Sequence, residues 1–370
     1  MSRAAAFCEK FDYPEELAEL LGEVARAAED LLQPLAGIVL TPSVSSGDFL
    51  WRRSDGRVEF LSDLDGFVFS DASAETIAQF RDSLARIAAG RGGPAFEIDL
   101  SVNRISQLGK MPNAFQMVET HLAGFELLGE GLLEKFPSEF DPRVSRQALL
   151  LNLFKPLAAQ SEEQWAQSAA RLLLDVPLIA TSEEGICRPG HRARASWFLE
   201  EDTSRFAASQ PLRQGVEAAL AARLDPPGNA AALHAFLVPA MEALLPLIDG
   251  EGLFPSSPNL ALVERLSSWL PPLPVRRRLG ELRSCLRRRT SLSADYTWWR
   301  ARKEALGGAA LWGLLQIAYA QRPLERSTSE ILGLFARQSP LEIDRLDFVE
   351  RACNQYRAGF FELYPSRNRQ

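Results

Sequence analysis

The spacing of apolar residues changes near residue 105, and this change limits what the chain can fold into. Before it, short apolar runs typical of strands alternate with segments whose apolar residues recur at helical spacing. Beyond residue 110 the spacing is almost purely helical, in runs separated by loops rich in proline and glycine. The pattern predicts an α+β protein: a small mixed-sheet domain over residues 1–140, followed by a larger all-α domain over residues 141–370, with a possible subdivision near residues 271–274.

The N-terminal part has a predicted order of helix, strand, hairpin, strand, helix and strand. We expect helices over residues 15–32 and 73–89, strands over residues 36–40, 62–70 and 96–102, and a hairpin over residues 49–61. An Asp-Gly pair at Asp55 and Gly56 marks the hairpin turn. The helix over residues 73–89 is long enough for a crossover that brings the two strands flanking it side by side.

The composition argues against several classes of protein. Lys and Arg number 41 and Asp and Glu number 48, so the net charge is −7 and long-range attraction to nucleic acid is not expected of the whole chain. The most apolar stretch, Ala230 to Asp249, contains two prolines, a histidine and a glutamate, and is typical of a buried helix, not a membrane span. Four widely spaced cysteines and three histidines form no zinc or disulfide pattern. We expect a cytoplasmic protein.

Four acidic residues lie on the two strands that flank the 73–89 helix. Asp63 and Asp65 are two residues apart, as are Glu97 and Asp99, so each pair shares one face of its strand. Carboxylates gathered on one sheet repel each other unless a cation neutralises them, and Mg²⁺ is the hard cation that oxygen ligands ordinarily hold together with substrate phosphates. The alternative is that these residues form the solvated face of a sheet edge. The apolar residues between them favour the metal interpretation.

A loop rich in serine precedes the first acidic pair and favours the same chemistry. It runs from Thr41 to Asp48, directly after the 36–40 strand. Small hydroxyl side chains and a glycine allow phosphate oxygens to approach the backbone closely. We therefore interpret this loop as a phosphate-binding turn.

Taken in order, these residues resemble the DNA-polymerase-β-like nucleotidyltransferase superfamily. Its signature is a strand, Gly-Ser-x-x-x-Gly-(Glu/Asp), a strand with apolar-Asp-x-Asp, and a third acidic residue on a neighbouring strand. The matching segments here are Pro42 to Asp48, Ser62 to Asp65 and Glu97 to Asp99. The resemblance covers residues 36–102, and looks closest to bacterial members that place a hairpin between the two motifs and append a helical region.

The resemblance implies a metal-dependent transfer of a nucleoside monophosphate. Asp63 and Asp65 would bind Mg²⁺ ions that bridge the phosphates of a nucleoside triphosphate. Asp99 would complete the second metal site and help to deprotonate the acceptor; Glu97 shares its face and could exchange roles with it, but Asp99 lies deeper in its strand. The acceptor would be a hydroxyl of a small molecule or saccharide, and pyrophosphate would be released. The turn residues implied to hold phosphate are Ser43, Ser45, Ser46 and Gly47.

One departure from the signature keeps a second interpretation open. Pro42 stands where the superfamily has its first glycine, and proline lacks an N–H and fixes φ. The chain could therefore be a catalytically weakened nucleotide-binding or protein-interaction module of the same fold.

A segment rich in arginine suggests a third interpretation. Residues 276–303 contain ten arginines and lysines and the pair Trp298 and Trp299, which would suit an RNA-tailing or cyclic-oligonucleotide enzyme. A solvated basic helix with tryptophans in a core is the favoured interpretation of this segment. Lys155, interpreted as mid-helix, and His191, interpreted as part of a loop, are weaker candidates for phosphate contacts.

Overall fold

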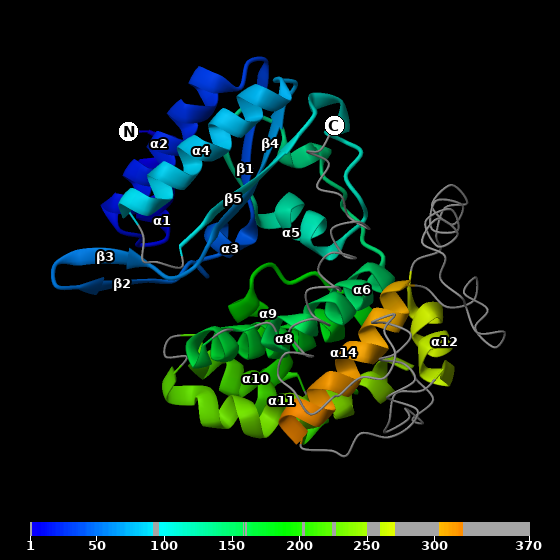
Figure 1. The fold of residues 1–370 in the computed structure, drawn as a ribbon. Helices are drawn as coiled ribbons and strands as arrows, with labels where there is room; N and C mark the ends of the chain where they lie inside the picture. The colour runs from blue at the N-terminus through cyan, green and yellow to red at the C-terminus, as the bar shows by residue number, and fades with distance from the viewer. Residues whose placement is uncertain are drawn as a thin grey trace. The chain divides into compact units, whose positions relative to one another are not determined.

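The computed structural model describes residues 2–91, 96–157, 159, 161–201, 204–223, 227–249, 260–270 and 303–320. The chain divides into two compact units (Figure 1). The first contains the residues up to Phe140 together with Cys187–Arg194, and the second contains Asp141–Ile186 and the chain from Ala195. The predicted fold class is confirmed: a mixed four-stranded sheet with helices is followed by a largely helical region.

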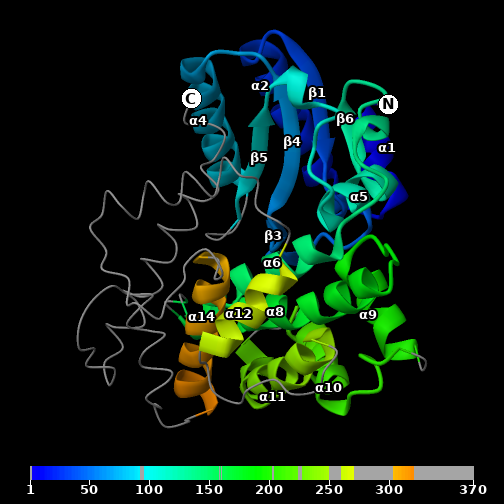
Figure 2. The ribbon, with the colours of Figure 1, turned by 90° about the vertical axis from the view of Figure 1, so that its right-hand side faces the viewer.

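The first unit is built on a sheet whose strands lie in the order β5-β4-β1-β6 (Figure 2). These strands are β1 (Leu35–Leu40), β4 (Leu64–Ser70), β5 (Ile98–Asn103) and β6 (Phe125–Leu128). The pairing of β4 with β5 is parallel, as the predicted crossover requires, whereas β1 is antiparallel to both β4 and β6. The strand β6 was not predicted: it is a four-residue edge strand that is defined by its pairing with β1 more than by its own apolar pattern.

Strand alternation gives the sheet two apolar faces. On one face, Leu64 and Val68 pack in a core with residues of α2 (Glu15–Leu31) and α4 (Ala74–Arg91). On the other, Phe67 and Phe69 pack in a smaller core with residues that include Met117 of α5 (Phe115–Ala123). Figure 1 shows α2 and α4 along the first face. The sheet is therefore covered by helices on both sides, with the second face less fully covered beside β5, where Asp99 and Ser101 are exposed.

The remaining elements of the first unit are short. The predicted hairpin is formed by β2 (Trp51–Ser54) and β3 (Arg57–Phe60), and both residues of its turn, Asp55 and Gly56, have positive φ, as this turn requires. The helix α1 (Arg3–Lys10) was not predicted. The other short elements are α3 (Pro42–Ser45), η1 (Ile105–Gln107) and η2 (Leu133–Lys135).

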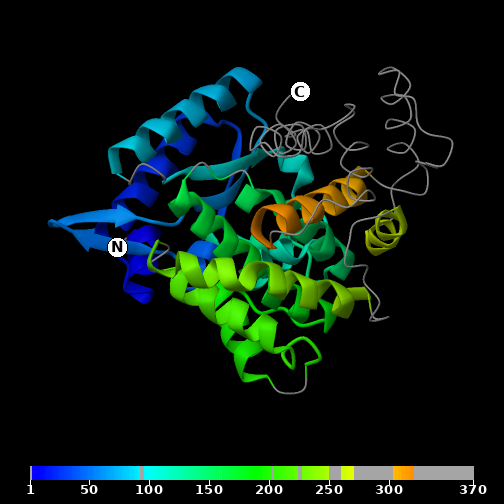
Figure 3. The same cartoon turned by 60° about the horizontal axis from the view of Figure 1, so that its bottom comes forward.

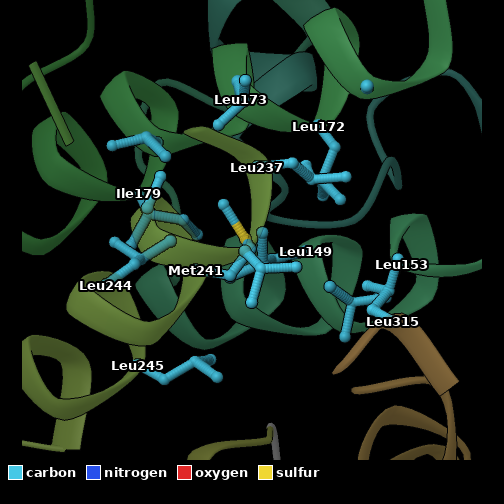
Figure 4. Packing of buried hydrophobic residues seen from close by; sticks show 14 of the residues in the cluster. Leu149, Leu153, Leu172, Leu173, Ile179, Leu237, Met241, Leu244, Leu245 and Leu315 are labelled. Atoms are coloured by element: carbon cyan, nitrogen blue, oxygen red, sulfur yellow. The ribbon is translucent and has the colours of Figure 1, made fainter. Parts of the chain in front are cut away.

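The second unit is a helical bundle. Its helices are α6 (Pro142–Asn152), α7 (Phe154–Leu157), α8 (Glu162–Glu183), α9 (His191–Glu200, from Ala195 on), α10 (Gln210–Ala222), α11 (Ala230–Asp249), α12 (Leu260–Trp269) and α14 (Lys303–Ala320), with η3 at Pro227–Asn229. Leucine, alanine and tryptophan side chains fill one continuous core. Figure 4 shows Leu172 and Leu173 of α8 near Leu237 of α11 in this core.

Helix α11 is long and apolar enough to cross a membrane by length and composition alone. It nevertheless packs against α8 and α10, and α10 and α11 lie side by side in Figures 1 and 3. Its buried residues, such as Leu237 and Met241, belong to the core of the helical unit. The core helix of a globular protein can have the same length and apolar composition as a membrane span. The packing of α11 agrees with the expectation of a buried helix.

Candidate functional site

The structure places Asp65 and Asp99 side by side on the sheet. They are register partners in the parallel pairing of β4 with β5, so their Cα atoms are separated by the ordinary strand spacing of about 4.8 Å. Both side chains lie on the face opposite α2 and α4, because Leu64 and Leu100 on the alternate positions belong to the core beneath those helices. Asp65 is half-buried and Asp99 is exposed. A carboxylate pair is thus presented on the accessible part of this face.

The other two predicted carboxylates precede the strands. Asp63 lies one residue before β4 and is half-buried, and Glu97 lies one residue before β5 and is exposed. The backbone carbonyl of Glu97 accepts a hydrogen bond of 2.9 Å from the amide of Leu64. Among the residues that the structure describes, no group of three or more His, Cys, Asp or Glu side chains is placed to hold a metal ion. The structure therefore pairs Asp65 with Asp99, and no third carboxylate of the described residues closes a cage around them.

Gly66 allows the strands to pack closely immediately after Asp65. A Cβ atom at this position would lie 2.7 Å from the carbonyl oxygen of Val39 and 2.8 Å from Cδ2 of Leu100. A larger residue would have to push β4 away from its neighbours. Gly66 thus fixes the strand position that sets Asp65 beside Asp99.

The predicted phosphate turn reaches the same place. The amide and hydroxyl of Thr41 donate to the carbonyl oxygen of Asp65 at 3.0 and 3.2 Å. The hydroxyls of Thr41 and Ser43 are 2.9 Å apart and hydrogen-bonded. The end of β1, the first turn residues and the backbone of Asp65 are therefore joined, and the half-buried Ser43 is linked to Asp65 through Thr41.

The turn is not an open loop, however, and this corrects the prediction. Residues 42–45 form the short helix α3, with Pro42 at its first position, where a missing N–H costs nothing. Ser45 is buried and its hydroxyl donates to the carbonyls of Thr41 and Ala123. The Ser46 hydroxyl donates to the carbonyl of Pro42 at 2.5 Å. Gly47 has φ of +79°, a conformation that favours glycine.

Of the four predicted phosphate ligands, the structure thus leaves Ser43 the best placed. The hydroxyls of Ser45 and Ser46 serve the turn itself, and Gly47 shapes its end. The beginning of the turn is bonded to the backbone of Asp65 through Thr41.

A buried polar cluster that the sequence did not predict lies next to the end of the turn. Asp48, only 2% exposed, accepts hydrogen bonds from the backbone amide of Arg192 at 3.3 and 3.2 Å. Glu119 of α5 forms a buried ion pair with Arg194 and accepts from the amide of Gly190 at 3.0 Å. The cluster joins the end of the turn, at Asp48, to α5 and to the segment Cys187–Arg194, which we call the strap. The available signal was Glu119 itself, a carboxylate in a helix that contains no lysine or arginine to pair with it.

The strap also corrects the interpretation of His191 as a loop residue. His191 is the first residue of α9, and the half-buried ring lies within hydrogen-bonding distance of the Arg194 guanidinium, at 3.2 Å. Lys155 lies in the short helix α7 of the second unit. The basic segment over residues 276–302, Trp298, Trp299 and the possible division near residues 271–274 lie outside the described residues, so the RNA interpretation stays a prediction.

Two cysteines offer a direct test of how firmly the strap is held. Burial raises the pKa of the Cys8 thiol to about 11 and that of the strap residue Cys187 to about 12, with Glu119 adding to the latter and Arg194 opposing it. At pH 8 we therefore expect iodoacetamide to alkylate both at least about a hundredfold more slowly in the native protein than in urea, because the thiolate is the reactive form. Peptide mapping by mass spectrometry reports each cysteine separately. Rapid native alkylation of Cys187 would contradict a docked strap.

Comparison with known proteins adds no assignment at this point. No family model matches the chain, and no curated protein matches it. The functional argument therefore depends on the geometry of the site.

Proposed function

We propose that the protein is a metal-dependent nucleotidyltransferase that moves a nucleoside monophosphate from a nucleoside triphosphate to a hydroxyl acceptor. The observation that supports this most strongly is the register pairing of Asp65 with Asp99 on the accessible face of the sheet. Two carboxylates on neighbouring parallel strands, with a hydroxyl-bearing turn bonded to the same strand, suit a site for a cation and phosphates together. The resemblance to DNA-polymerase-β-like enzymes supports the same reaction.

The donor set fits magnesium. Mg²⁺ prefers oxygen ligands and is usually held by one or two carboxylates together with substrate phosphates, not by an all-protein cage. Asp65 and Asp99 would be these ligands, with Asp63 the further candidate before β4 and Glu97 the alternative before β5. Bound Mg²⁺ would neutralise the charge on the phosphates and on the oxygens that attack and leave. Among the described residues no three carboxylates are placed to hold an ion. This is compatible with a Mg²⁺ ion that binds together with its nucleotide, because the phosphates supply the remaining ligands.

The chain's own residues would position the reacting groups. The acceptor hydroxyl attacks the α-phosphorus and forms a new P–O bond, while the bond from that phosphorus to the oxygen bridging the α- and β-phosphates breaks. Pyrophosphate leaves with the electron pair of that bond. The Asp99 carboxylate, exposed to the acceptor side, takes up the hydroxyl proton and passes it to solvent. The Ser43 hydroxyl, which is hydrogen-bonded to Thr41, would donate to a phosphate oxygen. Thr41 in turn donates to the carbonyl of Asp65.

Label transfer tests this proposal. The protein is incubated with Mg²⁺, each α-labelled nucleoside triphosphate and fractionated small-molecule and saccharide acceptors. We expect label to appear in a product larger than the nucleotide, with one pyrophosphate released per label and no transfer in excess EDTA. Triphosphate binding without pyrophosphate release in every fraction would contradict the enzyme.

A second candidate is a nucleotide-binding module that lacks activity. Two observations favour it: Pro42 supplies no N–H to the turn, and the Ser45 hydroxyl is buried against backbone carbonyls, so the turn offers few donors to a triphosphate. This candidate predicts saturable nucleotide binding that no acceptor converts into pyrophosphate release. The same incubation thus separates the two.

A further inference from the structure

The strap is part of the first unit, although its sequence neighbours on both sides belong to the second. Its anchors are backbone groups and buried side chains: the amides of Gly190 and Arg192 donate to Glu119 and Asp48, and Arg194 donates to the carbonyl of Arg188 at 3.1 Å. Arg194 itself is only 3% exposed and lies over the ring of Phe115, 5.4 Å from its centroid. A segment that is distant in sequence is thus fixed to the N-terminal unit by buried hydrogen bonds.

The strap packs directly on the turn of the candidate site. A Cβ atom at Gly190 would lie 2.5 Å from both the Ser46 hydroxyl and the Asp48 carboxylate, so the backbone at Gly190 approaches these two side chains as closely as glycine permits. Helix α3 has only four residues, which span about 6 Å at 1.5 Å per residue. The strap contacts the end of this short element, and Thr41 at its beginning is bonded to Asp65. Only about one helical turn of chain therefore separates the residues that the strap contacts from the residue bonded to the Asp65 backbone.

Two cationic side chains of the strap face solvent. Arg188 and Arg192 are exposed, and neither forms an ion pair with another residue in the parts of the chain that the structure describes. Arg192 is near the end of the turn, because its backbone amide donates to the Asp48 carboxylate. Positive charge is thus available next to the turn.

The turn itself needs such charge if it is to hold phosphates. Pro42 contributes no N–H, and the Ser45 and Ser46 hydroxyls donate to backbone carbonyls. Asp48, at the end of the turn, adds negative charge close to where phosphate would lie. Arginine is the residue best suited to phosphate recognition, because its guanidinium donates two parallel hydrogen bonds to phosphate oxygens.

We propose that the strap forms the phosphate side of the candidate site, with Arg188 and Arg192 binding the β- and γ-phosphates of the nucleoside triphosphate. This inference rests on the proposed function and names the residues that would replace the donors missing from the turn. Glu119 and Arg194 are positioning residues, which hold the strap in place without touching the nucleotide.

Isothermal titration with two probes tests this assignment, namely inorganic tripolyphosphate without metal and ATP with Mg²⁺. The variant is Arg188→Ala/Arg192→Ala, which removes both guanidinium groups but leaves every backbone anchor of the strap intact. The control is Arg26→Ala/Arg86→Ala, which removes two exposed arginines from α2 and α4, the helices on the other face of the sheet. A further variant, Asp65→Asn/Asp99→Asn, removes the carboxylate pair.

We expect the strap variant to weaken tripolyphosphate binding by about tenfold or more per arginine, with the control unchanged. AMP binding should be the same in wild type and strap variant, because AMP has no β- or γ-phosphate. Equal tripolyphosphate and MgATP affinities in wild type and the strap variant would overturn the strap assignment and leave the proposed function standing. If instead the strap variant loses tripolyphosphate binding while Asp65→Asn/Asp99→Asn leaves MgATP binding unchanged, the strap is supported and the proposed metal site is not.

Discussion

The Asp65→Asn and Asp99→Asn variants should each reduce nucleotidyl transfer by about a thousandfold or more. Asparagine keeps the size of the side chain and removes its charge, so the position on the strand is preserved while the ligand for Mg²⁺ is lost. Electrostatic stabilisation of charge in a transition state commonly contributes several kcal/mol, which corresponds to losses of this size. The rate of α-label transfer under saturating MgATP measures the effect.

A matched control keeps this prediction specific. Asp82→Asn removes an exposed carboxylate from α4, a helix that covers the opposite face of the sheet, and should transfer label at the wild-type rate. All three variants should have unchanged circular dichroism, because none of these carboxylates is buried. Wild-type transfer by Asp65→Asn or Asp99→Asn would place the reaction elsewhere in the molecule.

The largest stability effect is expected at Arg194. Its guanidinium is buried against the Glu119 carboxylate, and Arg194→Ala would leave that carboxylate buried with only the Gly190 amide as a charge-stabilising partner. Removing one member of a buried ion pair ordinarily costs about 3–5 kcal/mol. We therefore expect the free energy of unfolding of the first unit to fall by about that amount in urea titrations.

Two companion variants show whether the pair itself causes the loss. Arg192→Ala removes an exposed guanidinium two residues away and should change the unfolding free energy by less than about 0.5 kcal/mol. The double variant Glu119→Leu/Arg194→Met removes both charges and should recover part of the lost stability, because no unpaired charge stays buried. Faster alkylation of Cys187 in Arg194→Ala would report release of the strap itself. Equal stability of Arg194→Ala and Arg192→Ala would contradict this account of the strap.

The sequence predicted the architecture where local pattern decides the structure. The apolar residues of the 62–70 segment predicted a strand, and the 73–89 helix predicted a crossover that sets it beside the 96–102 strand. The structure adds the burial of both faces of β4 and the register that pairs Asp65 with Asp99. The Asp55-Gly56 turn likewise has the positive φ angles that its residues favour. Period and turn chemistry are local properties, and a single sequence shows them directly.

What the sequence could not show depends on contacts between distant segments. The strand β6 is short and gains its definition from β1, about 90 residues earlier in the chain. The strap reaches Glu119 and Asp48 from 71 and 144 residues away in sequence, and no local signal announces such a contact. The serines at 45 and 46 suited a phosphate loop by composition, yet their hydroxyls satisfy backbone carbonyls of a helix that begins at Pro42. Composition gives the available donors, whereas the fold decides which of them are already used.

The most direct test of the central claim is a double-mutant cycle on Mg²⁺-dependent ATP binding, measured by titration calorimetry with wild type, Asp65→Asn, Asp99→Asn and the double variant. If both carboxylates hold one cation with its nucleotide, each single variant should lose most of the Mg²⁺-dependent affinity and the double variant little more, a strongly non-additive cycle. Wild-type affinity for ATP that is the same with Mg²⁺ and with EDTA, or single losses that simply add in the double variant, would contradict it.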